Sequence, residues 1–271
     1  MHAPYEDLSR PGFVRVADLT SPEEAFARAR GLIDRRCVAD RWGPAELIGD
    51  FVLPPHEGPQ TREFQTLHFD FGLPLDPKVE HDVARYTALY VVADRDRVSA
   101  VTRLVPLAGL LAQRRWPSGS ELVRRLIAYG STHGAWDDAS GYVEGSLARL
   151  IEAAAGASPR LPSVKAEPEF LCGLEFDRLE AELAFFAHHG LRVEPVQVEV
   201  ALQPGELLVF DNLAFAHGRR GIRQPGELHQ RVFGHRRLNP SAQRRLRDRV
   251  LSAFHDSQSG HPGPLAAAST P

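Results

Sequence analysis

The stretch Phe210–Leu238, FDNLAFAHGRRGIRQPGELHQRVFGHRRL, and the short upstream segment Leu67–Asp70, LHFD, hold the residues that we expect the rest of the chain to bring together. Two histidines and one carboxylate are the ligands of a mononuclear non-haem iron(II) centre, which leaves further positions open for reactants. His68 and Asp70 are two residues apart, so on an extended strand their side chains would point to the same face. His217 lies 147 residues beyond Asp70 and can join them only through the fold.

Composition and charge are those of an ordinary globular protein. The chain has 271 residues, of which 43% are hydrophobic and 25% charged. A net charge of −3 gives no reason to expect nucleic acid or a membrane surface as partner. The N-terminal stretch MHAPYEDLSRPGF lacks a signal-peptide core, and no apolar run reaches membrane-spanning length. We expect a cytoplasmic protein, with Cys37 and Cys172 as buried, reduced thiols.

Hydrophobic patterning predicts short strands in both halves of the chain. The clearest strand is Arg85–Ala93, RYTALYVVA, which is rich in β-branched and aromatic residues. The other expected strands are Gly12–Leu19, Glu46–Leu53, Arg62–Asp70, Ser99–Val105, Leu191–Ala201, Glu206–Phe210 and Gln230–Leu238.

Helices are predicted before and between these strands. The capping box Ser21-Pro22-Glu23-Glu24 opens a helix that should end near Arg36. Further helices are expected at Pro106–Arg114, Ser120–Tyr129, Gly141–Ala155, Asp177–His189 and from Asn239 onward. This order favours an antiparallel, mainly β architecture with helical decoration over a βαβ alternation. We expect one domain, residues 1–255, with a helical insertion around 106–190 and a disordered tail at 256–271.

Two segments carry the chemistry. In the first, a predicted strand runs through His68 and Asp70 into an expected loop, which is a suitable place for metal ligands that must also admit a substrate. In the second, the turn Gln203–Glu206 feeds a short apolar strand, and His217 follows it. A polar loop then leads to a strand that carries Arg231. Either segment alone is a moderate signal at best, whereas the pair is a strong one.

Together these segments resemble the iron(II)/2-oxoglutarate-dependent oxygenases of the taurine-dioxygenase and clavaminate-synthase type. The matching pieces are His68-x-Asp70, the run PGELLVFDNLAFAHGR at Pro204–Arg219, and Arg231, fourteen residues after His217. The resemblance implies a double-stranded β-helix (jelly-roll) core that binds Fe(II) through His68, Asp70 and His217. It also implies 2-oxoglutarate and O2 as cosubstrates, with the far carboxylate of 2-oxoglutarate paired to Arg231.

Several other residues compete for roles in cosubstrate and substrate binding. Thr102 is the candidate for the threonine that helps to hold 2-oxoglutarate in the resembled family, and an ordinary strand threonine is the equal alternative. Arg237 is the alternative to Arg231, and His235 on the same strand face could point toward substrate. The arginines nearer to His217 are expected on a loop and are therefore weaker candidates: Arg219, Arg220 and Arg223. His81 and His133 are expected in solvated loops.

Asp70 favours hydroxylation, since the related halogenases carry a small residue at that position. We expect hydroxylation of a small molecule, such as an amino acid or an intermediate derived from one, with release of succinate and CO2. Desaturation and cyclisation stay open. Two alternatives also stay open: a non-haem iron oxygenase that does not use 2-oxoglutarate, and a catalytically silent jelly-roll binding protein.

Overall fold

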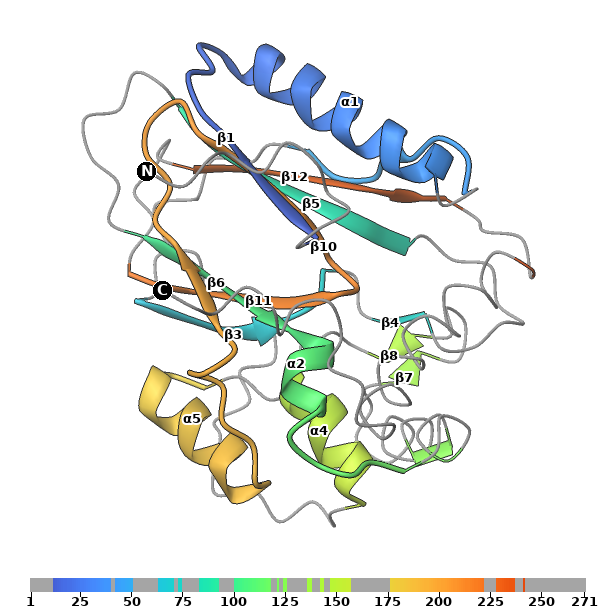
Figure 1. The fold of residues 1–271 in the computed structure, drawn as a ribbon, viewed down its shortest axis with the longest axis vertical. Helices are drawn as coiled ribbons and strands as arrows, with labels where there is room; N and C mark the ends of the chain where they lie inside the picture. Colours follow the sequence, from blue (N-terminus) through green and yellow to red (C-terminus); the bar gives the residue numbers. More distant parts are fainter. Residues whose placement is uncertain are drawn as a thin grey trace.

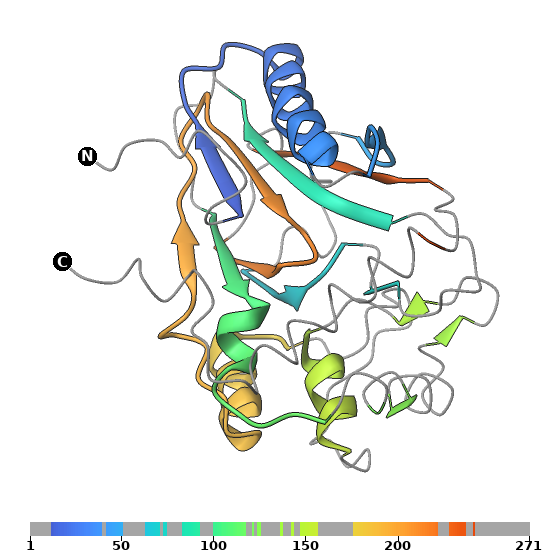
Figure 2. The same cartoon turned by 45° about the vertical axis from the view of Figure 1, so that its right-hand side comes forward.

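The computed structural model describes residues 12–39, 42–50, 63–70, 73–74, 83–92, 100–117, 121, 124–125, 136–137, 142–143, 147–156, 176–221, 228–236 and 241. In this part of the chain, antiparallel strands form two principal sheets, with helices on their outer faces (Figures 1 and 2). The expectation of a mainly β protein decorated by helices is confirmed. Among the described residues, none of the helices has the length and apolar character that a membrane span requires.

The first sheet has five strands in the order β1-β10-β5-β12-β2. Their bounds are Phe13–Val16 for β1, Leu207–Asp211 for β10, Val83–Val91 for β5, Leu228–His235 for β12 and Glu46–Leu47 for β2. Every residue of the central strand β5 is buried, including Arg85, and its other side chains are apolar, aromatic or β-branched. Helix α1, Pro22–Ala39, covers the outer face of this sheet (Figure 1).

The second sheet has four strands in the order β3-β11-β6-β9. Their bounds are Phe64–His68 for β3, Phe215–Arg220 for β11, Val101–Pro106 for β6 and Val198–Val200 for β9. Three helices pack on its outer side: α2 at Leu107–Leu111, α4 at Leu147–Ala155 and α5 at Leu179–His188. A small third sheet joins β4 (Leu73–Pro74), β8 (Tyr142–Val143) and β7 (Trp136–Asp137).

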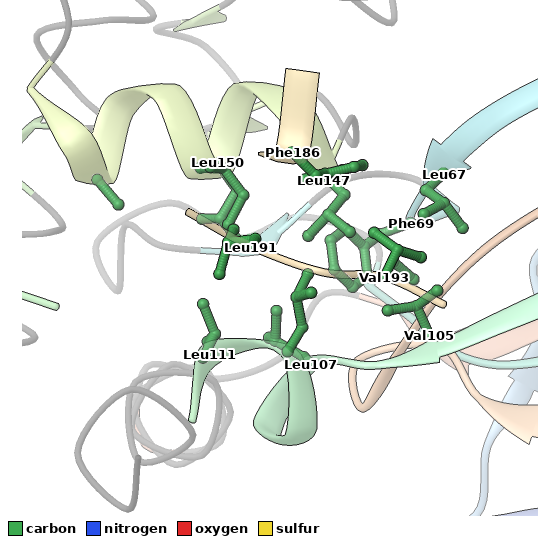
Figure 3. Close-up of a cluster of buried hydrophobic side chains, with 14 of the residues drawn as sticks. Leu67, Phe69, Val105, Leu107, Leu111, Leu147, Leu150, Phe186, Leu191 and Val193 are labelled. Carbon is green, nitrogen blue, oxygen red and sulfur yellow. The ribbon is translucent and has the colours of Figure 1, made fainter. Parts of the chain in front are cut away.

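Three apolar clusters hold these layers together. One lies between the two principal sheets and includes Leu89, Leu104, Leu208 and Phe210. A second lies between α1 and the five-stranded sheet. In the third, side chains of α2, α4 and α5 meet those of β3 and β6 (Figure 3). Burial of apolar surface on both faces of each sheet therefore fixes which side chains of a strand point inward between the sheets.

Successive strands alternate between the two principal sheets over most of the chain. The five-stranded sheet takes β2, β5, β10 and β12, and the four-stranded sheet takes β3, β6, β9 and β11. Strands β11 and β12 are thus neighbours in sequence but members of different sheets. This alternation brings the end of β3, the start of β11 and the middle of β5 to one place.

Several predicted boundaries need correction. The segment His217–Arg220, expected to open a loop, lies in strand β11, because β3 and β6 pair with it on both sides. The expected strand Leu191–Ala201 is reduced to β9, since the chain makes turns up to residue 197. The expected strand Arg62–Asp70 ends at His68, and Asp70 lies in a turn. Trp136–Asp137, expected in a loop, forms the short strand β7.

Other local predictions are confirmed. The Glu24 N–H donates to Ser21 Oγ at 3.2 Å, as a capping box requires, while the Glu24 carboxylate accepts from the Thr20 N–H at 2.8 Å. Gly190, with φ of 71°, follows α5 in the left-handed conformation that suits a C′ glycine. Several predictions fall outside the described residues: His81, His133, most of Ser120–Tyr129, the final helix after residue 241, and the tail at 256–271.

Candidate metal centre

His68, Asp70 and His217 come together between the two principal sheets. One donor atom from each lies within 4.8 Å of the others. His217 of β11 is the direct register partner of His68 at the end of β3, and their ring centroids are 4.2 Å apart. His68 Nε2 lies 3.8 Å from Asp70 Oδ1, and His217 Nε2 lies 3.6 Å from Asp70 Oδ2. Strand pairing thus supplies the two imidazoles, and the turn after β3 supplies the carboxylate.

The spacing and chemistry of these donors fit one divalent cation. Two donors that are each about 2.1 Å from an ion, at 90–110° to one another, lie about 3.0–3.4 Å apart. The observed nitrogen–oxygen distances of 3.6 and 3.8 Å are a few tenths of an ångström wider, so a small inward movement would complete the geometry. Two imidazoles and one carboxylate on one side of an ion are the donor set of non-haem iron(II). The cluster is a candidate metal centre.

A contact with the backbone orients the first imidazole. His68 Nδ1 lies 2.8 Å from the Thr66 carbonyl oxygen and donates its proton there, which leaves the Nε2 lone pair directed toward Asp70. The Gln65 amide nitrogen lies 3.5 Å from the same Nε2. Gln65 therefore stands at the edge of the candidate centre and would have to move slightly for a metal to bind His68 Nε2.

Asp70 is held by the other sheet. Thr87 of β5 donates its hydroxyl to Asp70 Oδ2 at 2.5 Å. Asn212, in the turn between β10 and β11, accepts the Asp70 N–H at 2.9 Å and donates to the Asp70 carbonyl at 3.0 Å. The same amide donates to the Ala84 carbonyl of β5 at 2.9 Å, and the Asn212 side chain is fully buried. Asn212 therefore fixes the backbone of Asp70 against the five-stranded sheet.

A buried ion pair supports β3 from the outer side. Glu182 of α5 accepts the Leu67 N–H at 2.7 Å and pairs with Arg103 of β6 at 2.7 Å. Both side chains have 0% exposure. Burial raises the pKa of the Glu182 carboxyl, and the charge of Arg103 opposes that rise. Because Leu67 precedes His68, this pair ties the position of the first imidazole to helix α5.

Thr102 lies on the same face of the four-stranded sheet as the cluster. Leu104 of β6 is the register partner of His217, and Thr102 is the partner of Arg219. Residues two apart on a strand share a face, so Thr102 and Arg219 both point toward the space between the sheets that holds His217. The two side chains are buried, with exposed fractions of 5% and 1%.

Arg231 and His235 lie on the opposite face of the five-stranded sheet from the cluster. Arg231 pairs in register with Ala88, whereas its neighbour Thr87 points toward Asp70. The Arg231 guanidinium lies 4.3 Å from the ring centroid of Phe26 in α1 and pairs with Asp50. The structure therefore does not bring Arg231 to the three donors.

The suggestion that His235 points toward substrate needs correction for the same reason. Its Nε2 lies 4.0 Å from Cys37 Sγ, and its ring lies 5.5 Å from that of Trp42. Burial, with a smaller contribution from the Arg85 charge, lowers the pKa of His235 to about 4. His235 is thus a buried histidine beneath α1.

Sequence reasoning assigned no role to four residues around the cluster, Gln65, Thr87, Asn212 and Glu182, and gave Arg219 only as a weaker candidate. Arg219 had a usable signal, because a residue two positions after His217 shares its face if the segment is a strand. The run of polar residues after His217 hid that strand. Asn212 and Glu182 had no signal of their own, since their roles depend on tertiary contacts with Asp70 and Leu67.

Comparisons with known proteins give distant likenesses. No family model matches the chain, and no curated protein matches it. Among solved structures it is similar to a taurine dioxygenase from Burkholderia xenovorans, with 17% identity over 87% of this chain and 81% of that one, at a TM-score of 0.31. A second protein from that organism, provisionally assigned as an alpha-ketoglutarate-dependent taurine dioxygenase, has 14% identity over 85% and 78% of the two chains, at 0.32. TM-scores this low do not establish a shared fold, so the residues of this chain carry the proposal.

Proposed function

We propose that this protein is an Fe(II)- and 2-oxoglutarate-dependent oxygenase that hydroxylates a small molecule. The observation that carries the proposal is the convergence of His68, Asp70 and His217 between the sheets, with their donor atoms within 4.8 Å. The alternation of β2, β3, β5, β6, β9, β10, β11 and β12 between two sheets supports a double-stranded β-helix as the core. In this proposal residues 1–255 form a single jelly-roll domain.

In the proposed site His68 Nε2, His217 Nε2 and the Asp70 carboxylate hold iron(II) from one side. When bound, iron(II), 2-oxoglutarate and O2 would together supply an oxidant able to attack a C–H bond: one oxygen atom of O2 would enter succinate as CO2 is lost, and the other would enter the hydroxylated product. The chain fixes the ligands: the Thr66 carbonyl sets the tautomer of His68, and the Thr87 hydroxyl restrains one oxygen of Asp70. A carboxylate at position 70 favours hydroxylation, with desaturation and cyclisation as variants of the same chemistry.

The substrate in this proposal is an amino acid or an intermediate derived from one. That choice rests on the resemblance of the two motif segments to the taurine-dioxygenase and clavaminate-synthase type. No nucleic-acid or membrane partner is proposed.

The position of Arg231 favours a second candidate. The resemblance assigns the far carboxylate of 2-oxoglutarate to Arg231, yet this side chain lies over Phe26 beneath α1. A non-haem iron oxygenase that does not use 2-oxoglutarate would need no arginine for that purpose. The two candidates share the metal centre and differ in the cosubstrate.

An anaerobic titration tests both candidates. Purified protein receives iron(II) and then 2-oxoglutarate, while the visible metal-to-ligand charge-transfer band is recorded. The proposal predicts stoichiometric iron binding and a band that saturates with 2-oxoglutarate, followed by succinate formation when air is admitted with candidate substrates. Iron binding without the band would favour the second candidate, and absence of iron binding would refute both.

Histidine variants make the titration specific to the cluster. His68→Ala should abolish iron binding, because it removes one of three protein ligands. His188→Ala is the matched control, since His188 is an exposed histidine at the end of α5. Stoichiometric iron in His68→Ala would contradict the assignment of the ligands.

A further inference from the structure

We propose that Gln65, Arg219 and Thr102, together called the polar row, form the site for the far carboxylate of the 2-oxo acid cosubstrate. This inference rests on the proposed function and deepens it, because it assigns the carboxylate to an arginine of β11 instead of Arg231 of β12.

Strand register places the polar row beside the metal ligands. Across β3, β11 and β6, one row of partners is His68, His217 and Leu104. The next row on the same face is Gln65, Arg219 and Thr102. The first row carries two of the three proposed ligands, and the second carries an amide, a guanidinium and a hydroxyl.

A β-bulge brings Gln65 into the polar row. Between the pairs His217–His68 and Arg219–Gln65, β11 advances two residues while β3 advances three. Gly218 permits this close approach, since a Cβ on it would lie 2.7 Å from the Gln65 carbonyl oxygen. Bulges commonly redirect a side chain beside a functional site. Here the Gln65 amide reaches within 3.5 Å of His68 Nε2.

Reach and chemistry fit a dicarboxylate chelated at the metal. Two residues along a strand span about 6.6 Å. The terminal carboxyl carbons of an extended five-carbon diacid are about 5 Å apart, from four bonds of about 1.5 Å. The planar guanidinium of Arg219 matches a carboxylate with two parallel charge-assisted hydrogen bonds, and the neutral donors of Gln65 and Thr102 can add to them.

The other arginines near the cluster point elsewhere. Arg220, the next residue on β11, is half exposed on the opposite face and pairs with Glu199 at 2.5 Å. Arg103, next to Thr102, is buried in its ion pair with Glu182. Arg231 lies beneath α1 with Asp50. Arg219, by contrast, is 1% exposed on the face of His217, with Nη1 donating to the Gly221 carbonyl at the end of the strand.

The test measures 2-oxoglutarate affinity of the iron(II)-loaded protein by the charge-transfer band, without turnover. Arg219→Ala should weaken 2-oxoglutarate binding by about 100-fold and Arg219→Lys by about 10-fold, because hydrogen bonds to a charged group are among the strong ones. Thr102→Val should weaken it by about 3-fold to 10-fold. Arg220→Ala is the matched control, with unchanged affinity. Iron affinity in the absence of 2-oxoglutarate should be the same in all of these proteins.

A cosubstrate analogue without the far carboxylate tests whether Arg219 contributes to affinity through that carboxylate. 2-Oxobutyrate keeps the metal-binding 2-oxo acid end but lacks the second carboxylate. Wild-type protein should prefer 2-oxoglutarate to 2-oxobutyrate by at least about 10-fold, and Arg219→Ala should lose that preference. A merely structural role for Arg219 would weaken both compounds equally, which would overturn the proposal.

The outcomes separate this inference from the proposed function. If the wild-type protein binds iron but not 2-oxoglutarate, the proposed function fails and this site fails with it. If 2-oxoglutarate binds and Arg231→Ala loses affinity while Arg219→Lys keeps it, the proposed function stands and the polar row is refuted. Should Arg219→Ala fail to fold, Arg219→Lys and Arg231→Ala still decide between the two arginines, because each changes only one of them.

Discussion

Strands β11 and β12 follow one another in sequence, and each carries a histidine and an arginine, yet they use them on opposite sides of a sheet. In β11, His217 and Arg219 point into the space between the two sheets. In β12, Arg231 and His235 point outward beneath α1. The four residues are of the same two types, but only the pair on β11 faces the space that holds the candidate metal centre.

The difference shows that strand parity, and not residue type, decides which of these side chains can reach a metal. A strand sends alternate side chains to opposite faces, so a register shift of one residue would exchange them. On β12 the outer face is fixed by Phe233, which stacks on Phe26 at 5.7 Å between ring centroids. That contact commits Arg231 and His235 to the same outer face.

The largest difference between the two strands is expected in iron affinity when one histidine is removed from each. His217→Ala should lower iron affinity by at least about 100-fold, more than the loss expected for an outer residue of a metal site. His235→Ala should leave iron affinity unchanged, because its ring lies against Cys37 and Trp42. Equilibrium dialysis with iron(II) under anaerobic conditions measures both. Equal losses would mean that β12 reaches the metal centre.

Asn212 provides the next largest effect. Asn212→Ala removes the three hydrogen bonds that hold Asp70 and Ala84, so iron affinity should fall by about 10-fold to 100-fold. The control is Leu32→Ala in α1, which also loses stability but lies in the separate cluster beneath that helix. If the Asn212→Ala protein kept wild-type iron affinity, the turn after β3 would hold Asp70 in place without the hydrogen bonds of Asn212.

The burial of His235 on the outer face of β12 should make the free energy of unfolding depend on pH. The pKa of His235 is lowered to about 4 in the folded state by burial and by Arg85, whereas an unfolded histidine titrates near its ordinary value. The contribution of uncharged His235 to the free energy of unfolding is therefore fully present above about pH 6.5 and is lost as pH falls toward 4. The loss should reach about 2 kcal/mol by pH 5. Urea unfolding of metal-depleted protein at pH 7.5 and 5 measures the loss.

The same experiment on His235→Gln checks the origin of the pH effect. A glutamine cannot be protonated in this range, so the variant should lose about 2 kcal/mol less than wild type between the two pH values. An unchanged pH dependence in His235→Gln would place the acid-sensitive group elsewhere.

The smallest effect is expected at the ion pair on β12. Asp50 is 66% exposed, so Asp50→Ala should change the free energy of unfolding by no more than about 1 kcal/mol. Urea unfolding at low and at high salt measures this change. A loss of several kcal/mol would mean that the Arg231–Asp50 pair anchors β12. The outward orientation of Arg231 would then be fixed by this pair as well as by the packing of Phe233.

Local signals in the sequence predicted a large part of the fold. The apolar and β-branched run of β5 and the capping residues of α1 predicted those elements, because both depend on neighbours along the chain. Spacing and residue type also singled out His68, Asp70 and His217, which the fold brings together. The strand through His217 was missed, because a run of glycine and arginines reads as a loop until partner strands are known.

The faces of the strands could not be predicted in the same way. The face on which Arg231 lies depends on the register of β12 with β5. On the outer face its guanidinium stacks on the ring of Phe26. The bulge that turns Gln65 toward His68 depends on Gly218 and β3 together. These are properties of paired strands, so a single segment does not encode them.

The most direct test of the metal centre is anomalous diffraction at the iron edge, from crystals grown anaerobically with iron(II) and 2-oxoglutarate. We expect one strong peak bounded by His68 Nε2, His217 Nε2 and the Asp70 carboxylate, with the far carboxylate of 2-oxoglutarate against Arg219. A peak at any other set of side chains, or iron with no contribution from His217, would contradict this expectation.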